Sequence, residues 1–199
     1  MLIVFAVGVT VAELIARRGR VATPRPECCP VCGHDWLTFA GWWPRQTRWG
    51  RVDVHRVLCT SKPCGKTHSC WPDVLVGGRV DVVEVIGAAL EAKAAGWGHR
   101  RIAGGLGVPE GTARGWLRRF ALIASAVARA LVAAAAAADP VVRAPPEGNV
   151  LEVAVAWVGL AAAALHSLSG EPVDRWRFAV MVMAGRLLAP PTGSAPAAP

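Results

Sequence analysis

Acidic residues are scarce in this chain, which has 14 aspartates and glutamates against 22 lysines and arginines. The formal net charge is therefore +8, which favours an anionic partner: nucleic acid first and a membrane surface second. Tyrosine is absent, so the aromatic content rests largely on nine tryptophans. Five of these fall in the segment that carries the cysteines: Trp36, Trp42, Trp43, Trp49 and Trp71.

The chain also lacks the pattern of a secretion signal. Its N-terminal segment is apolar, but the positive charges follow the apolar run, which is shorter than the ~20 residues of a membrane-spanning helix. We expect instead a short strand over "LIVFAV" and a helix that begins with a Thr10–Glu13 capping box and ends at Gly19. A cytoplasmic location follows, and paired cysteines in that reducing compartment hold metal more often than they form disulfides.

The cysteines include two spaced pairs, each followed directly by a glycine. Cys29 and Cys32 form a CxxC turn, and Cys59 and Cys64 form a wider pair. The stretches between the pairs carry aromatic and β-branched residues in partial alternation, which predicts a β-hairpin. A hairpin that brings two such turns to one tetrahedral ion is a zinc ribbon. We predict a structural zinc ion with these four cysteines as ligands and no position open to water.

One histidine competes for this site, and two cysteines are left over. Cys28 and Cys70 are spare, because only Cys29 mirrors the arrangement of the second pair. His68 can replace Cys59, since the Cys64–His68 spacing also suits a metal ion. The widened second pair leaves that alternative open.

Arginines and tryptophans alternate in "WWPRQTRWGR", residues 42–51. Such a strip can lie on phosphates or stack on bases. A tryptophan core beneath a solvated arginine face explains the same pattern equally well.

A second motif is "HRRIAGGLGVPEGTARGWLRRF", residues 99–120. Gly107 fits a turn between two helices, and Ala103 fits their close crossing. Ala113 and Trp116 form the inward face of the second helix, and Pro109 suits a helix's first turn. The preceding "VDVVEVIGAALEAKAA" places apolar residues at helical spacing. Together these segments predict a three-helix unit with a helix-turn-helix.

The outward face of the second helix is basic. Arg114 and Arg118 lie one turn apart there and are predicted to read base edges, because arginine is the usual reader of guanine. Thr112 can reach either a base or a phosphate. The arginines predicted to contact phosphates are Arg100, Arg101 and Arg119.

In this order, the CPVC turn, "HRVLC", "WPDVL" and "GVPEGTARGWLRRF" resemble a bacterial family with a zinc ribbon followed by a helix-turn-helix. That family is similar to the N-terminal DNA-binding part of insertion-sequence transposases. The resemblance covers roughly residues 24–120 and, more weakly, "RWRFAVMVMAGRLLA" near the end. It implies zinc-dependent binding of double-stranded DNA, as a regulator or in a mobile element. The family usually has two residues inside the second cysteine pair, whereas four separate Cys59 from Cys64.

Transposase chemistry itself is not expected, because strand transfer needs a carboxylate triad that holds two metal ions. None of the acidic residues after residue 120 lies in a strand-like run: Asp139, Glu147, Glu152, Glu171 and Asp174. The roughly 80 residues that remain are also too few for a complete nuclease domain. No histidine accompanies a recognisable serine or cysteine nucleophile motif, so we expect neither an enzyme nor a small-molecule substrate.

Five segments are predicted along the chain. Residues 1–24 form the strand and helix, 25–79 the ribbon and 80–138 the helix-turn-helix domain with an extended helix. Residues 139–189 open with a proline-rich linker and continue as helices around 150–168 and 174–189, and the low-complexity tail 190–199 is disordered. The predicted class is mainly α with a small β zinc ribbon.

The C-terminal helices are apolar but alanine-rich and interrupted by charge, so a helical bundle is preferred to a membrane anchor. They would also allow two copies of the chain to pair as a homodimer. Two other functions compete with DNA binding. One is a membrane-associated protein with a cytoplasmic metal-binding head, and the other is an adaptor that binds another protein.

Overall fold

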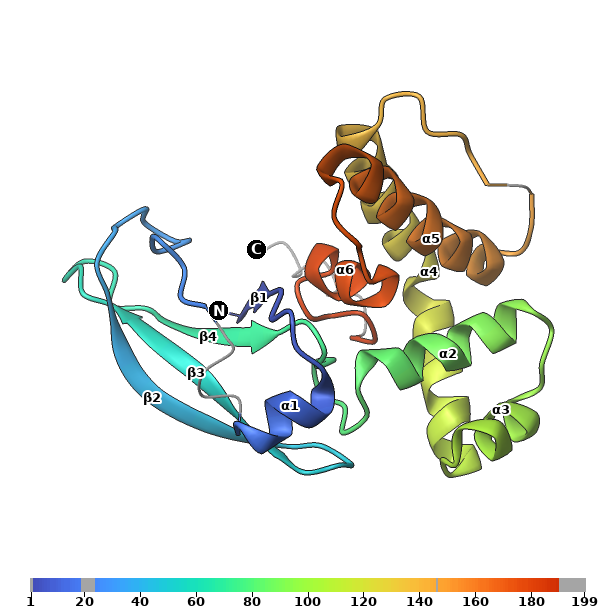
Figure 1. Cartoon of the computed structure of the whole chain (residues 1–199), viewed down its shortest axis with the longest axis horizontal. Helices are drawn as coiled ribbons and strands as arrows, with labels where there is room; N and C mark the ends of the chain where they lie inside the picture. The colour runs from blue at the N-terminus through green and yellow to red at the C-terminus, as the bar shows by residue number, and fades with distance from the viewer. Residues whose placement is uncertain (1, 19–23, 146, 190–199) are drawn as a thin grey trace, which may run out of the picture.

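The computed structural model describes residues 2–18, 24–145 and 147–189, where four strands form one sheet and six helices pack beside it (Figure 1). The strands are β1 (Leu2–Phe5), β2 (Leu37–Gln46), β3 (Arg51–Cys59) and β4 (Thr67–Pro72). The helices are α1 (Val11–Ala16), α2 (Val83–Ala94), α3 (His99–Leu106), α4 (Glu110–Ala138), α5 (Val150–Ser169) and α6 (Arg175–Val182). The class is therefore mixed α and β, whereas the sequence predicted a mainly α protein.

The predicted hairpin between the cysteine pairs is confirmed. Strands β2 and β3 pair antiparallel, with a register shift between Phe39 and Trp42. Strand β4 adds to β3, and β1 adds to β4 in parallel, so that the sheet order is β1-β4-β3-β2. The N-terminal strand thus belongs to the same sheet as the hairpin, which enlarges the β part of the fold.

Helix α1 covers one face of this sheet. Its predicted capping box is present, with the Thr10 side chain accepting from the Glu13 N–H and the Glu13 carboxylate accepting from the Thr10 N–H. Leu14 is fully buried against a small core that includes Val52 and Val54 of β3. The helix ends at Ala16, and the predicted stop at Gly19 lies outside the described residues.

Helices α2, α3 and the first turns of α4 pack together as a three-helix unit. Gly107 ends α3 in the left-handed conformation, with φ of 63°, which a glycine adopts without steric cost. Ala113 and Trp116 are buried, as predicted for the inward face of α4. The apolar stretch after residue 120 continues the same helix, so α4 is one element of 29 residues.

The chain then turns back, and α5 lies against the second half of α4 (Figure 1). Helix α5 begins at Val150 and is capped by Asn149, which forms a capping box with Glu152. Helix α6 is shorter than the predicted 174–189 and ends at Val182, because Ala184 and Gly185 take left-handed backbone angles. The tail 190–199 lies outside the described residues.

The segment from α6 to residue 189 joins the sheet to the helices. The Gly77 N–H donates to the Gly185 carbonyl, and Arg177 reaches both the Val9 carbonyl and Glu84 of α2.

By length and composition, α4 and α5 are apolar enough to cross a membrane, and 33% of the most apolar window of each is buried inside the molecule.

Candidate metal centre and nucleic-acid interface

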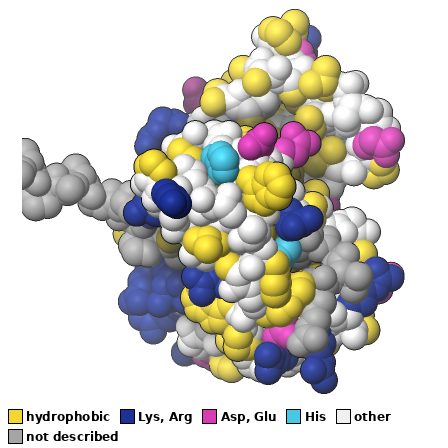
Figure 2. Space-filling view, turned by 90° about the vertical axis from the view of Figure 1, so that its left-hand side faces the viewer, with side chains coloured by type: hydrophobic (Ala, Val, Ile, Leu, Met, Phe, Trp, Pro, Cys, Tyr) yellow, Lys and Arg dark blue, Asp and Glu magenta, His cyan; other side chains and the backbone are white. Residues whose placement is uncertain are grey.

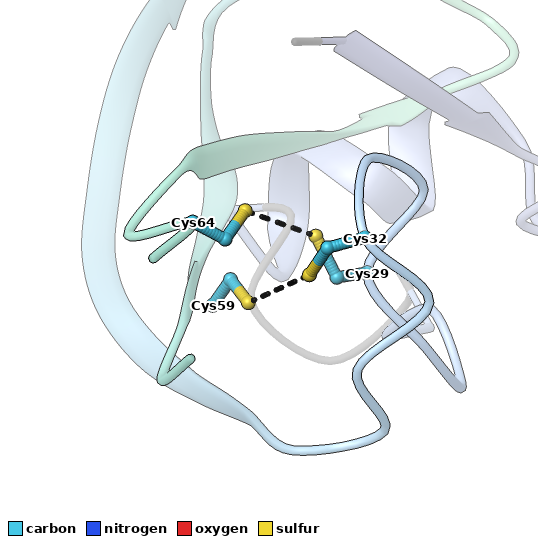
Figure 3. Close-up of side chains that lie close together, drawn as sticks. All are labelled: Cys29, Cys32, Cys59 and Cys64. Atoms are coloured by element: carbon cyan, nitrogen blue, oxygen red, sulfur yellow. Dashed lines mark hydrogen bonds between the residues drawn. The ribbon is translucent and has the colours of Figure 1, made fainter. Parts of the chain in front are cut away.

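Four cysteines meet at one end of the sheet (Figure 3). Cys29 and Cys32 lie in the turn before β2, Cys59 ends β3, and Cys64 lies in the turn that leads to β4. Their sulfur atoms all lie within 4.8 Å of one another, in an arrangement that can hold a metal ion. The structure therefore brings together all four predicted ligands.

Each cysteine turn is folded as a metal-binding turn requires. The glycine after each pair takes a left-handed conformation, with φ of 73° at Gly33 and 53° at Gly65. Backbone N–H groups of Val31 and Cys32 donate to the Cys29 sulfur, and the Lys66 N–H donates to the Cys64 sulfur. Such bonds orient the sulfurs and favour the thiolate form that a metal ion binds.

The sulfur separations also fit a tetrahedral ion. Metal–sulfur bonds of ~2.3 Å place the corners of a tetrahedron ~3.8 Å apart. The Cys29 and Cys64 sulfurs are 3.8 Å apart, and those of Cys32 and Cys59 are 3.6 Å apart. A disulfide would require ~2.05 Å, and these cysteines are free thiols. The donor set and its spacing thus suit a soft metal ion.

The thiols differ in how readily they ionise. Burial opposes ionisation of Cys29, but backbone N–H groups and His68 outweigh it and lower its pKa to about 6. Burial and the neighbouring cysteines raise the pKa of Cys59 to about 12. The pKa of Cys64 is also raised, because the bond from the Lys66 N–H and the contact with Cys59 are outweighed by burial and by the Cys32 and Cys29 sulfurs. Metal binding at neutral pH must therefore displace a proton from Cys59 and from Cys64.

His68 lies beside the four sulfurs. Its Nε2 is 3.3 Å from the Cys29 sulfur, the side chain is fully buried, and Nδ1 has no hydrogen-bond partner. Within the described residues, the one group of possible metal ligands whose atoms all lie within 4.8 Å of one another consists of the four cysteines and does not include His68. Cys28, which is exposed, and Cys70, which is buried in β4, are outside it as predicted.

The predicted base-reading arginines lie on the free face of α4. Arg114 and Arg118 are both exposed, and the buried Ala113 and Trp116 lie on the opposite side of the same turns. Thr112 and Arg119 are only partly exposed, since they line a hollow beside the loop before α2.

The other two predicted arginines are exposed on α3. Arg100 lies 3.6 Å from the Glu110 carboxylate at the start of α4. The guanidinium of Arg101 stacks over the Trp97 ring at 3.7 Å, which holds it at the surface. Trp97 was not among the predicted site residues, and its four-residue spacing from Arg101 is the signal that could have indicated it.

In the arginine–tryptophan strip, residues 42–51, two tryptophans are exposed to solvent and two arginines are held in ion pairs. Trp43 and Trp49 are about half exposed, so they are not a buried core. Arg48 and Arg51, however, are paired with the carboxylates of Asp81 and Asp53. Figure 2 views the molecule from the side where the sheet lies in Figure 1, and there hydrophobic side chains lie among lysines and arginines.

No protein-family model, curated protein or solved structure matches the chain.

Proposed function

We propose that the protein is a zinc-containing, double-stranded DNA-binding protein in which the start of α4 is the recognition helix. The observation that carries the proposal is the pairing of Arg114 and Arg118 on one exposed face, one helical turn apart. The opposite face is anchored by the buried Ala113 and Trp116. A helix held in this way can enter a major groove with its arginines toward the base edges.

The elements around α4 support this role. Helix α3 and the left-handed Gly107 precede it as in a helix-turn-helix, and α3 presents Arg100 and Arg101 at its own surface. The net charge of +8 adds attraction for phosphate. The motif resemblance to the DNA-binding part of transposases points the same way, as a regulator or as an element-derived factor.

Zinc is the ion that the cysteine centre suits best. Four thiolates in tetrahedral spacing are the usual donors of structural zinc, and four protein ligands leave no position for a substrate. When bound, the ion would crosslink the turn before β2 to the end of β3. The chain's own contribution is the set of backbone N–H groups that orient the sulfurs.

The test is selection of bound sequences from random duplex DNA, followed by binding measurements on arginine variants. Arg114→Ala and Arg118→Ala are each expected to weaken the selected site by about 1–3 kcal/mol and to relax preference at one or two positions. Arg101→Ala is expected to weaken selected and scrambled duplexes alike. Arg129→Ala is the matched control, since Arg129 is exposed on the far half of the same helix.

Equal losses on both duplexes for Arg114→Ala and Arg118→Ala would show that α4 does not read bases. Absence of any salt-dependent DNA affinity in the wild-type protein would contradict the proposal as a whole and favour an adaptor.

A second candidate function rests on the apolar lengths of α4 and α5. Their partial burial is compatible with a membrane-associated protein that carries the metal centre outside the bilayer. Fractionation distinguishes the two, since a DNA-binding protein is recovered without the membrane pellet.

A further inference from the structure

A hollow of about 330 Å³ lies where the loop before α2 meets the start of α4. The loop contributes Arg79 and Asp81, and three turns of α4 contribute Gly111, Thr112 and Arg119. These α4 residues lie beside the face that carries Arg114 and Arg118. The hollow is therefore adjacent to the proposed base-reading surface but distinct from it.

The hollow is positively charged and its charge is not balanced within the described residues. Neither Arg79 nor Arg119 forms an ion pair there, and Arg79 Nε is buried without a hydrogen-bond partner. The one carboxylate of the lining, Asp81, is occupied by Arg48. Burial, together with the charges of Arg119 and Arg45, lowers the pKa of Arg79, so like charges face one another around this space.

The α4 side of the hollow is built to accept an oxyanion. Gly111 has no Cβ, and one built there would meet no atom within 4 Å, so the space beside the first turn is open. Pro109 caps the helix without a side-chain hydrogen bond, and the Thr112 N–H donates to the Pro109 carbonyl, so the first-turn N–H groups left for a ligand are those of Glu110 and Gly111. Thr112 adds a hydroxyl donor.

The opposite wall is fixed by the sheet. The Arg48 N–H donates to the Val80 carbonyl at 2.8 Å, and the Arg45 guanidinium donates to the Arg79 carbonyl. The turn between β2 and β3 thus holds the loop that carries Arg79. A ligand in the hollow would bridge the sheet and the three-helix unit.

We propose that this hollow binds a phosphate group between Arg79 and Arg119, and that in the DNA complex the group is a backbone phosphate. The second part rests on the proposed function. With its phosphate seated there, the duplex would be fixed in register beside α4, with Arg114 and Arg118 toward the neighbouring base edges. Free inorganic phosphate offers the same oxygens and would use the same donors.

The DNA arm of the test compares Arg79→Gln with Arg129→Gln on a selected and a scrambled duplex at several salt concentrations. Arg79→Gln is expected to weaken both duplexes alike and to lower the slope of log affinity against log salt by about 0.9, as for one lost phosphate contact. Arg129→Gln is expected to leave that slope unchanged.

The second arm titrates inorganic phosphate into the DNA-free protein and follows the backbone amides of Gly78, Gly111 and Thr112 by NMR. Wild-type amides are expected to shift, and Arg79→Gln and Arg119→Gln to abolish the shift while circular dichroism stays unchanged. Gly111→Ala narrows the hollow and is expected to weaken binding. Gly104→Ala is its control, because it too adds a methyl group into open space in a helix.

The outcomes separate this site from the proposed function. If phosphate shifts the backbone amides but the protein has no affinity for DNA, the phosphate site stands and the DNA proposal is overturned. If Arg79→Gln lowers the salt slope of DNA binding but inorganic phosphate shifts no amide, the result supports a DNA phosphate as the ligand. DNA binding with an unchanged slope for Arg79→Gln and no phosphate shifts would overturn the site and leave the recognition helix intact.

Discussion

The cysteine thiols of the metal centre ionise very differently. Cys29 has a pKa of about 6 and is largely a thiolate at neutral pH, whereas Cys59 has a pKa of about 12 and is a thiol. Because a metal ion binds thiolates, its affinity should rise with pH above neutrality as Cys59 and Cys64 lose protons more easily. The asymmetry arises because burial and the neighbouring sulfurs oppose ionisation of Cys59, whereas backbone N–H groups and His68 outweigh the burial of Cys29.

Substitution of single cysteines tests the ligand set. Cys32→Ser is expected to lose the metal, and Cys28→Ser, its matched control four residues away, to retain close to one zinc per chain. Cys70→Ser should also retain it. Elemental analysis of the purified proteins is the measurement, and zinc retention by Cys59→Ser together with its loss from His68→Ala would make His68 the fourth ligand instead.

A buried carboxylate gives a pH-dependent prediction. Burial raises the pKa of Asp73, which is 3% exposed and accepts a hydrogen bond from the Val7 N–H. A carboxyl group with a raised folded-state pKa contributes stability below its unfolded pKa, and that contribution is lost as pH rises through the folded value. Asp73→Asn should therefore stabilise the protein increasingly as pH rises above about 4, the value of an unfolded aspartate.

Urea unfolding at several pH values measures the difference in unfolding free energy between Asp73→Asn and wild type. Because acid would release metal from both proteins alike, that release does not contribute to the difference. Asp35→Asn is the control, since the Asp35 side chain is 91% exposed. A difference between Asp73→Asn and wild type that does not grow with pH would show that the Asp73 carboxylate carries no burial penalty.

At the scale of elements, the packing of α6 on α2 depends on one glycine. A Cβ at Gly87 would lie 2.4 Å from ring atoms of Trp176, which α6 lays across α2. Gly87→Ala is expected to destabilise the protein by about 1–3 kcal/mol through overpacking. Gly159→Ala in α5 meets no atom within 4 Å and should stabilise by up to about 1 kcal/mol, because alanine favours the helix. Thermal unfolding of the two variants compares them directly.

Those elements that depend on local signals could be predicted from the sequence. The Thr10–Glu13 capping box, the β2–β3 hairpin and the helices on either side of Gly107 all follow from residues close in the chain. The clustering of Cys29, Cys32, Cys59 and Cys64 was also predicted, because glycine after each cysteine pair restricts how the turn can fold.

What could not be predicted depends on contacts distant in the chain. The pairing of β1 with β4 joins Leu2 to Ser69, and no local pattern specifies a parallel partner so far away. The hollow was missed for the same reason, since Arg79 is a single arginine after two glycines and meets Arg119 only when the sheet and helices pack.

At the scale of the whole molecule, the metal centre is remote from the helical core. The core among the helices contains none of the cysteines, and β3 carries the chain ~30 Å from the turn near Arg48 to Cys59. Removal of metal with a chelator should therefore loosen the cysteine turns while most of the helical circular dichroism persists. Limited proteolysis should then cut between residues 24 and 66. Cooperative loss of the helical signal on chelation would contradict this separation.

Both edge strands of the sheet, β1 and β2, are poorly suited to pair with a strand from another chain. The outer margin, β2, has an irregular register after Phe39 and contains Pro44, which has no N–H to offer a neighbour. The other margin, β1, is only four residues long, and it covers β4. Deletion of residues 2–5 would expose the edge of β4, a regular and largely buried strand. Pairing of β1 with β4 therefore protects copies of the chain from aggregating through that edge.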